Sequence, residues 1–354
     1  MLRSSRTALD ADPLLAAGSA RNWRGSRRPP PIPVKTLTKR HFTLALDPLA
    51  PPPGLERAIL AIGNFDGIHR GHVAVIHRAQ ALAAARGLPC AVLTFEPHPS
   101  DFFGGLGTIF RLSPLETKAA LVEKLGIDGM IVLTFDAALA SLPAEDFVRD
   151  ILVKRLGAGG VIAGYDFHFG YKRGGTPAFL KAAGETYGFT VEIVERIDSD
   201  ESGAIQIASS TATRAALEAG DIAQATALLG HPYVISGPVL PGAQLGRTLG
   251  FPTANIQAPP SCRLRHGIYA VRAEVEGETY DGVASYGRRP TVDNGAPLLE
   301  TFLFDFSGDL YGKVMHVSFI AWIRPEEKFE SLEALTAQIA RDAEEARRIL
   351  KGTA

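Results

Sequence analysis

The chain has 354 residues, of which 46% are apolar and 21% are charged, a balance that is ordinary for a globular protein with room for two domains. Its formal net charge is −1, from 37 basic and 38 acidic side chains. Residues 1–40 carry nine of the basic and two of the acidic side chains, so the rest of the chain holds 28 basic against 36 acidic ones. An acidic body argues against a nucleic-acid-binding face.

The first 40 residues are predicted to form a disordered basic extension. The segment RNWRGSRRPPPIP is rich in proline, glycine and charge and has no apolar periodicity. It lacks the apolar core of a secretory signal, and an organelle transit peptide is the alternative. The two cysteines, Cys90 and Cys262, have no metal-type spacing, and no apolar run is long enough to cross a bilayer. We therefore expect a cytoplasmic protein that does not enter a membrane.

From residue 57 onwards, short apolar runs alternate with helical stretches. The expected strands are residues 58–63, 90–95, 129–135 and 160–164. The expected helices are residues 71–87, 113–126 and 144–157. Buried strands that alternate with helices predict an α/β domain with a Rossmann-like parallel sheet and right-handed crossovers. Ligands of such sheets bind beyond the carboxyl ends of the strands.

The stretch GNFDGIHRGH, Gly63 to His72, follows the first expected strand at that edge. Glycines such as Gly63 and Gly71 let the backbone approach a phosphate closely, and the next helix offers free amides and a positive dipole. His69 and His72 can donate hydrogen bonds to charge that develops on a transferred phosphoryl group. The alternative is that both histidines are structural.

A second stretch, SSTATRAALEAG from Ser209 to Gly220, begins with hydroxyl side chains and opens a helix with Arg214 in its first turn. By itself it predicts a well-capped helix and nothing more. In combination with the two histidines it predicts a second clamp for phosphate groups.

The pattern changes near residue 230, where short β-type segments separated by turn signals begin. The expected strands are residues 233–240, 267–277, 278–287, 299–306 and 313–323. They predict a small antiparallel β-barrel. Residues 331–350 have helical apolar spacing after a Ser331 cap, so a C-terminal helix should pack one face against the barrel.

The stretch GAQLGRTLGFPTANI, Gly242 to Ile256, lies within this second half. Its glycines and Arg247 suit a loop that folds over phosphates. Thr253 and Asn255 alternate onto one side, as ligands of Mg²⁺ would. The alternative is a glycine-rich turn of the barrel without a ligand.

The H-x-G-H corner and the later S-S-T-x-x-R helix start resemble the HxGH nucleotidylyltransferase superfamily. The longer forms GNFDGIHRGH, TFEPHP (Thr94 to Pro99) and GYDFHFG (Gly164 to Gly170) resemble the adenylyltransferase half of prokaryotic bifunctional riboflavin kinase/FAD synthetases. The chain departs from the family's pattern at Tyr165 and His168. The first departure replaces an acidic or amide residue, and the second replaces an arginine.

Four motifs of the second half resemble the riboflavin kinase module of the same family and occur in its order. They are GRTLGFPTANI, GRRPT (Gly287 to Thr291), DLYG (Asp309 to Gly312) and IRPEEKF (Ile323 to Phe329). The chain departs at Ser285–Tyr286, where the family has an asparagine–isoleucine pair, and after Glu300, where a histidine often follows. The resemblance covers residues 57 to 350.

The resemblance implies an FMN adenylyltransferase (FAD synthetase) domain at 41–228 and a riboflavin kinase domain at 229–354. The kinase phosphorylates riboflavin to FMN with ATP, and the adenylyltransferase converts FMN and ATP to FAD and pyrophosphate. Riboflavin, FMN and ATP are then the partners, ATP being the co-substrate, Mg²⁺ the cofactor, and FMN and FAD the products.

The resemblance also implies roles for particular residues. The catalytic residues are His69, His72, Arg214 and Glu300, the last as the base that faces a ribityl hydroxyl of the flavin. ATP and its phosphates are bound by Gly63, Asn64, Phe65, Gly71, Ser210, Thr211, Gly246 and Arg247. The flavin is bound by Phe95, Pro97, Asp166, Arg289 and Arg324, and the metal by Thr253 and Asn255. From the residues alone, Phe95 fits the core as well as a flavin contact.

Two other functions stay open at this point. An HxGH adenylyl- or cytidylyltransferase for another acceptor would explain the first half and leave the barrel motifs unexplained. A non-catalytic flavin-binding regulator would not need His69, His72, Arg214, Thr253, Asn255 and Glu300 together. The sequence leaves the oligomeric state open.

Overall fold

The computed structural model describes residues 41–196, 208–242, 250–288 and 297–353. The predicted disordered extension, residues 1–40, lies outside this part of the chain. Three predicted site residues, Gly246, Arg247 and Arg289, lie outside it as well.

The first half of the described chain forms a six-stranded, wholly parallel sheet in the order β1-β4-β3-β2-β5-β6. The strands are β1 (Thr43–Leu46), β2 (Ile59–Ile62), β3 (Cys90–Glu96), β4 (Gly129–Thr134), β5 (Gly160–Gly164) and β6 (Thr190–Val194). The parallel α/β sheet is confirmed. The sequence did not predict the two outer strands, β1 and β6, because neither contains a fully buried residue.

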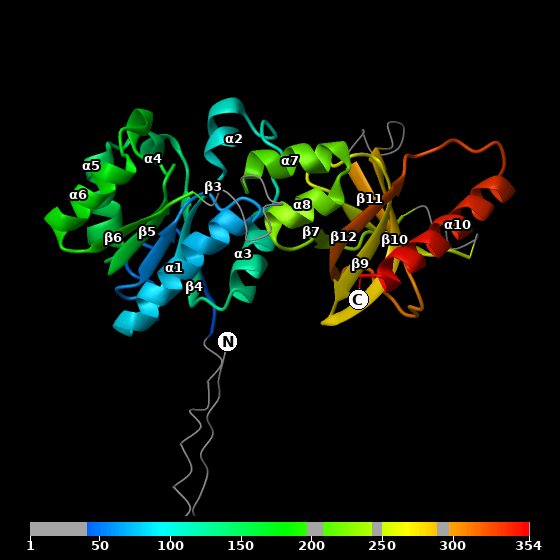
Figure 1. Ribbon diagram of the computed structural model, residues 1–354, viewed down its shortest axis with the longest axis horizontal. Coiled ribbons are helices and arrows are strands. Elements are labelled where there is room, and N and C mark those ends of the chain that lie inside the picture. The colour runs from blue at the N-terminus through cyan, green and yellow to red at the C-terminus, as the bar shows by residue number, and fades with distance from the viewer. Residues whose placement is uncertain (1–40, 197–207, 243–249, 289–296, 354) are drawn as a thin grey trace, which may run out of the picture. The chain divides into compact units, whose positions relative to one another are not determined.

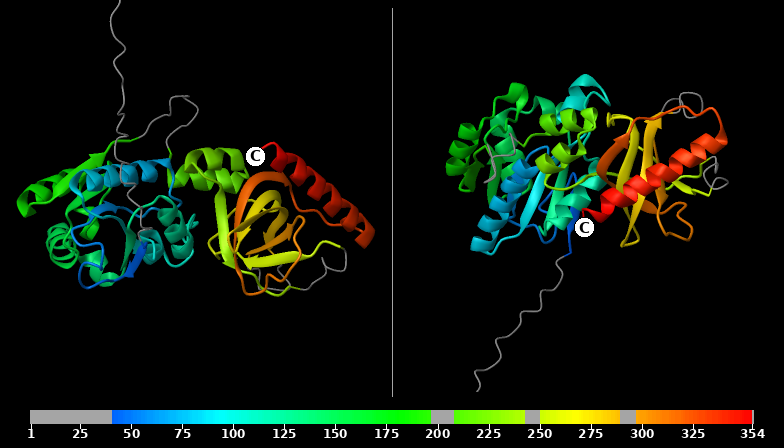
Figure 2. Two further views of the ribbon diagram at one scale, coloured as in Figure 1. Left: turned by 90° about the horizontal axis from the view of Figure 1, so that it is seen from below. Right: turned by 45° about the vertical axis from the view of Figure 1, so that its right-hand side comes forward.

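Helices cover both faces of this sheet, as Figures 1 and 2 show. α1 (Arg70–Arg86) and α3 (Leu115–Lys124) share a buried cluster with Ile59 and Ala61. The π-helix η1 (Phe147–Arg155) and α6 (Pro177–Tyr187) share another with Leu60 and Ile62. Because side chains of a strand alternate between its faces, each central strand is buried on both sides. The shorter helices here are α2 (Pro99–Gly104), α4 (Ala137–Ser141), α5 (Ala144–Asp146) and η2 (Tyr171–Arg173).

The sheet has a topological switch point beside β2. The chain continues from β2 to its neighbour β3 on one side and later returns to β5 on the other side. The connections that leave the carboxyl ends of β2 and β5 therefore run in opposite directions, which opens the crevice where ligands of such sheets bind. The GNFDGIHRGH and GYDFHFG stretches both begin at this crevice.

The second half forms a six-stranded sheet of antiparallel neighbours in the order β7-β12-β9-β10-β11-β8. The strands are β7 (Tyr233–Pro238), β8 (Thr253–Gln257), β9 (Gly267–Val275), β10 (Glu278–Arg288), β11 (Pro297–Leu303) and β12 (Val314–Arg324). An isolated bridge between Leu240 and Asn255 joins the chain after β7 to β8, so the sheet curls into a half-barrel. The sequence did not predict β8 as a strand.

The C-terminal helix α10 (Leu332–Lys351) lies across the strands of this sheet, as Figure 2 shows. Its residues Ala343, Ala346 and Leu350 pack against Val283 and Phe304. Inside the curl lies a separate core that contains the fully buried rings of Tyr269, Tyr286 and Phe319. The predicted packing of one helix face against the sheet is confirmed.

Two helices before residue 230, α7 (Ser210–Ala219) and α8 (Ile222–Leu229), share the core of the curled sheet. Leu217 and Ile222 belong to the same buried cluster as Tyr233 and Phe319. The chain from His41 onwards forms one compact unit. The predicted border between residues 228 and 229 stays a prediction. No helix in the described part of the chain is long and apolar enough to span a membrane.

Candidate active sites

The corner between β2 and α1 has an unusual backbone. Phe65, Gly67 and Ile68 all have positive φ angles, of 48°, 87° and 46°. A β-branched residue such as Ile68 rarely adopts this conformation, and the strain persists only where the surroundings enforce it. Phe65 and Ile68 are each 1% exposed, so buried packing holds the corner in this shape.

The two histidines of the motif lie together at the start of α1. His69 is the N-cap, and its Nδ1 accepts a hydrogen bond from the backbone N–H of His72 at 3.3 Å. The two rings stack with their centroids 3.6 Å apart. Gly71 belongs to this arrangement, because a Cβ there would lie 3.1 Å from the His69 ring.

Both histidines are electrically neutral near pH 7. Burial lowers the pKa of His69 to about 4. Burial, followed by repulsion from the His69 ring when that ring is protonated, lowers the pKa of His72 well below its ordinary value. Since the Nδ1 of neutral His69 accepts a bond, its Nε2 carries the proton and is the available donor. The pair can thus offer hydrogen bonds to a phosphate, while positive charge must come from other residues.

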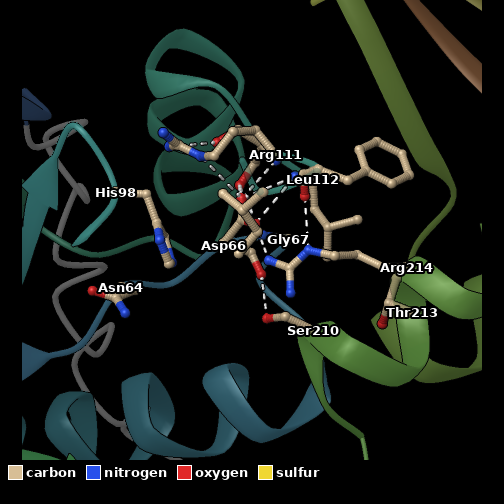
Figure 3. Close-up of polar contacts among 12 residues, drawn as sticks. Asn64, Asp66, Gly67, His98, Arg111, Leu112, Ser210, Thr213 and Arg214 are labelled. Atoms are coloured by element: carbon tan, nitrogen blue, oxygen red, sulfur yellow. Dashed lines mark hydrogen bonds and ion pairs between the residues drawn. The ribbon is translucent and has the colours of Figure 1, made fainter. Parts of the chain in front are cut away.

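A buried carboxylate, Asp66, lies at the centre of the corner (Figure 3). It is 1% exposed and accepts bonds from the backbone N–H groups of Leu112 and Ser113 at 3.0 and 2.9 Å. Burial by itself would raise its pKa, but the Ser113 N–H and the charge of Arg214 outweigh that effect and lower it. Sequence reasoning did not assign Asp66, although the residue stands inside the quoted motif.

Helix α7 is tied to this corner through its N-terminal half. The Nη2 atom of Arg214 lies 2.6 Å from Asp66 Oδ2, and its Nε donates to the Phe110 carbonyl at 2.7 Å. The Ser210 hydroxyl donates to the Asp66 carbonyl at 2.9 Å (Figure 3). The structure therefore brings Arg214 and Ser210 to the histidine corner. The cap of α7 is Ser209, and Thr211 is exposed.

The flavin candidates of the first half lie in different surroundings. Phe95 is 7% exposed and packs in the core, with ring centroids 6.2 Å from Phe135 and 6.3 Å from Phe147. Pro97 follows β3 and is half-buried, and Asp166 follows β5 and is exposed. Pro97 and Asp166 are thus accessible at the carboxyl edge, whereas the Phe95 ring serves the core.

The curled sheet carries a cavity of about 600 Å³. Predicted site residues Thr253, Asn255, Glu300 and Arg324 all line it. The lining also includes apolar side chains of the sheet, α10 and nearby segments, namely Phe251, Val283, Phe306, Leu335, Ile339 and Phe329. Such a mixture of apolar walls and a few polar groups suits a planar organic ring with a polar chain.

The strand register explains why three of these residues meet. In the β8–β11 ladder Asn255 lies opposite Glu300, and Thr253 lies opposite Phe302. Residues opposite one another and residues two apart share a face of the sheet, so Thr253, Asn255 and Glu300 point to the same side. Asn255 is 7% exposed, and its Oδ1 is buried without a hydrogen-bond partner among the described residues.

Helix α10 contributes a polar group that sequence reasoning missed. The Arg324 guanidinium donates to both carboxylate oxygens of Asp342, at 2.8 and 2.6 Å. Gln338 donates to the same carboxylate at 2.9 Å. Asp342 is 5% exposed and lines the cavity. Its position on the apolar stripe of α10, directly before Ala343, was the available signal.

Two family models match different parts of the chain. The FAD synthetase family model matches residues 52–211, and the riboflavin kinase family model matches residues 229–350. A bifunctional riboflavin kinase/FMN adenylyltransferase of Haemophilus influenzae is 42% identical over 294 residues, which is 83% of this chain and 94% of that protein. One from Pseudomonas fluorescens is 42% identical over 296 residues, again 83% and 94%.

A solved structure is also similar over most of the chain. It is named as a macrolide-efflux protein from Streptococcus pneumoniae, with a TM-score of 0.72 and 30% identity over 82% of this chain and 94% of that chain. The identities and coverage, together with the two matched modules and the two sites, decide the classification. The chain belongs to the family of bifunctional riboflavin kinase/FMN adenylyltransferases.

Proposed function

We propose that the two reactions of this bifunctional enzyme occur at two separate sites. The carboxyl edge of the parallel sheet transfers the adenylyl group of ATP to FMN, which gives FAD and pyrophosphate. The cavity of the curled sheet transfers the γ-phosphoryl group of ATP to riboflavin, which gives FMN and ADP. This proposal includes the domain border at residues 228 and 229, which the two family matches bracket.

In the adenylyl transfer, a phosphate oxygen of FMN attacks the α-phosphorus of ATP as the bond to the pyrophosphate oxygen breaks. Such displacements are catalysed mainly by positioning and by stabilisation of charge. His69 and His72, being neutral, would donate hydrogen bonds to the phosphate oxygens. Arg214 would add positive charge from the N-terminal half of α7. The amides at the start of α1, together with Gly63 and Gly71, would let phosphate approach the backbone.

In the phosphorylation, the 5′-hydroxyl of riboflavin attacks the γ-phosphorus of ATP as the bond to ADP breaks. An alcohol is a poor nucleophile near pH 7, so a carboxylate that accepts its proton promotes the attack. Glu300 would be that base, since this residue lines the cavity. Arg324 would contact the flavin from the end of β12, in an orientation that Asp342 maintains.

The residues of β8 fit a magnesium ion. A buried amide oxygen such as Asn255 Oδ1, which has no partner in the described part of the chain, costs free energy that a hard cation or its bound water would offset. Thr253 lies on the same side of the strand and offers a hydroxyl oxygen. Mg²⁺ held there would neutralise charge on the phosphate oxygens of ATP.

The single observation that carries the kinase assignment is the meeting of Glu300 and Asn255 across β8 and β11. Purified protein should therefore convert riboflavin, ATP and Mg²⁺ first to FMN and then to FAD, as chromatography of the flavins would show. Supplied FMN should be converted to FAD without the kinase step. Failure to change either flavin would refute the proposal, and conversion of FMN alone would leave only the adenylyltransferase.

A further inference from the structure

A chain of alternating buried charges runs beneath the histidine corner. Arg111 bonds both carboxylate oxygens of Glu96, at 2.9 and 2.6 Å, and its Nε lies 3.8 Å from Asp66 Oδ1. At one end of this chain of charges Arg214 forms an ion pair with Asp66, and at the other end Lys118 forms an ion pair with Glu96. The mechanism proposed above uses only Arg214 from this chain of charges, which leaves the other members without an assigned task.

Lys118 is the most deeply buried of these groups. Its side chain is 0% exposed, and its Nζ lies 2.9 Å from the Asn64 carbonyl oxygen, 3.3 Å from Thr94 Oγ1 and 3.0 Å from Glu96 Oε1. An ammonium group has three N–H donors, and each of these oxygens can accept one. The Thr94 hydroxyl also donates to the Asn64 carbonyl at 3.0 Å.

The position of these partners separates Lys118 from an ordinary buried ion pair. Asn64 directly precedes Phe65, the first residue of the strained corner that has a positive φ angle. Glu96 is the last residue of β3 and lies within the TFEPHP stretch. A single ammonium on α3 thus joins the end of β2 to the end of β3, at the edge where substrates bind. A strained loop keeps its shape only where such contacts enforce it.

Stability alone is a weak reason to place a lysine here. Burying a charge is costly, and an apolar side chain of similar size is often as good or better for stability. The pKa of Lys118 is lowered by its burial, against the opposing pull of Glu96.

We propose that Lys118 is a positioning residue for adenylyl transfer, which fixes the Asn64 carbonyl and thereby the corner that receives the phosphates of ATP. The inference rests on the adenylyl transfer proposed above. It assigns no contact between Lys118 and ATP, so the effect of the lysine passes through the backbone of Asn64 and Phe65. A misplacement of about 1 Å can cost about 100-fold in rate.

The test compares Lys118→Met with the wild-type protein in both reactions. The variant should lose about 100-fold in kcat/KM for ATP in FMN adenylylation, chiefly through a raised ATP KM. Its kinetic constants in riboflavin phosphorylation should not change, which also shows that the protein is folded. Lys124→Met is the matched control, because Lys124 lies on the same helix and its side chain is 67% exposed.

A second variant separates positioning from charge and from folding. Lys118→Met with Glu96→Gln removes one cation and one anion, so the buried cluster keeps its net charge and no carboxylate is left facing a lost ammonium. Glu96 also pairs with Arg111, so Glu96→Gln alone is measured beside it. If the ATP KM of adenylylation stays raised in the double variant and is near the wild-type value in Glu96→Gln, the contact with Asn64 is responsible. A return to the wild-type KM, or an unaltered KM in Lys118→Met, would overturn the inference. Wild-type protein that makes no FAD would instead refute the adenylyl transfer itself.

Discussion

The Arg214 guanidinium lies 2.6 Å from the Asp66 carboxylate, although 148 positions separate the two residues in the chain. Asp66 belongs to the corner after β2, and Arg214 belongs to the N-terminal half of α7. Helix α7 also shares the core of the curled sheet through Leu217. One buried ion pair therefore joins the two segments on which the adenylyltransferase signature depends.

Asp66→Asn should destabilise the protein and impair FAD formation. The substitution leaves Arg214 without its buried counter-ion, and breaking a buried pair costs about 3–5 kcal/mol of the free energy of unfolding. Urea denaturation measures this change. Asp150→Asn is the control, because Asp150 pairs with Arg149 on the surface, where solvent screens the pair and it contributes little to stability. Equal free energies of unfolding for the two variants would contradict the role of Asp66 as the buried counter-ion of Arg214.

The pH dependence of stability gives a second test of Asp66. Its pKa in the folded protein lies below the ordinary value of 3.8 that it regains on unfolding. The unfolded chain then binds more protons as the pH falls through this range. The contribution of Asp66 is therefore complete above the unfolded pKa and is lost as the pH falls towards the folded one. Stability measured from pH 6 down to about 2 should fall less steeply for Asp66→Asn.

His69→Ala and His72→Ala should each reduce FAD formation about 10²–10³-fold, because each removes a donor to a transition-state oxygen. Riboflavin phosphorylation should continue, so FMN should accumulate in both variants. Because the pKa of His69 is about 4, this residue does not change its protonation between about pH 6 and 8. The rate of FAD formation by the wild-type protein should therefore show no change due to His69 over that range. A loss of activity on raising the pH through 6.5 would mean that a charged imidazole is needed.

The sequence predicted the central parallel sheet because its strands are buried on both faces and stand out as apolar runs. It missed β1 and β6, whose residues are half-exposed or exposed. The sequence grouped His69, His72 and Arg214 because they stand in two motifs of one family, and it gave no evidence that their side chains lie close together. Asp66 and Lys118 escaped assignment because their roles come from partners at sequence separations of 22 to 148 positions, which local patterns do not encode.

In the second half, alternation identified five of the strands, and it placed Thr253 and Asn255 on one side of the chain. It did not recognise β8 as a strand, because the segment is short and follows a glycine- and proline-containing turn. Asp342 was missed for a different reason. Charged residues on helices are usually solvated, so its place on the apolar stripe of α10 was not enough to single it out, and the contact with Arg324 shows why this carboxylate is buried.

Asp342→Asn should weaken riboflavin binding in the kinase reaction. The change removes the negative charge that orients Arg324 in the cavity, so the guanidinium loses its fixed direction. We expect the KM for riboflavin to rise about 10-fold, while FMN adenylylation stays unchanged; the figure corresponds to the ~1.5–3 kcal/mol of a hydrogen bond to a charged group. Steady-state kinetics of both reactions measure this. Glu344→Gln, on the exposed side of α10, is the control and should behave like the wild type.

The double variant Thr253→Ala, Asn255→Ala should not make FMN but should still convert supplied FMN to FAD. Both changes remove oxygen atoms that would hold Mg²⁺ beside the phosphates of ATP. The lost kinase activity should return in part at higher Mg²⁺ concentration if metal binding is what was weakened. A folded variant with normal kinase activity would exclude both residues from the metal site. A capped turn without a metal role would instead lower the unfolding temperature without a selective effect on the kinase.

Glu300→Gln should separate binding from chemistry in the kinase. Glu300 lies on β11 opposite Asn255, and its side chain lines the cavity beside Thr253. Glutamine keeps the size of the side chain and an oxygen that accepts hydrogen bonds, but it cannot take the proton of the ribityl hydroxyl. Loss of a general base costs about 10²–10⁴-fold in rate. The variant should therefore bind riboflavin and ATP nearly as the wild type does, as fluorescence titration would show, and make almost no FMN.

Its conversion of added FMN to FAD should be normal, since the corner at β2 is untouched. FMN production near the wild-type rate would eliminate Glu300 as the base, and weakened riboflavin binding with an unchanged kcat would make it a binding residue instead.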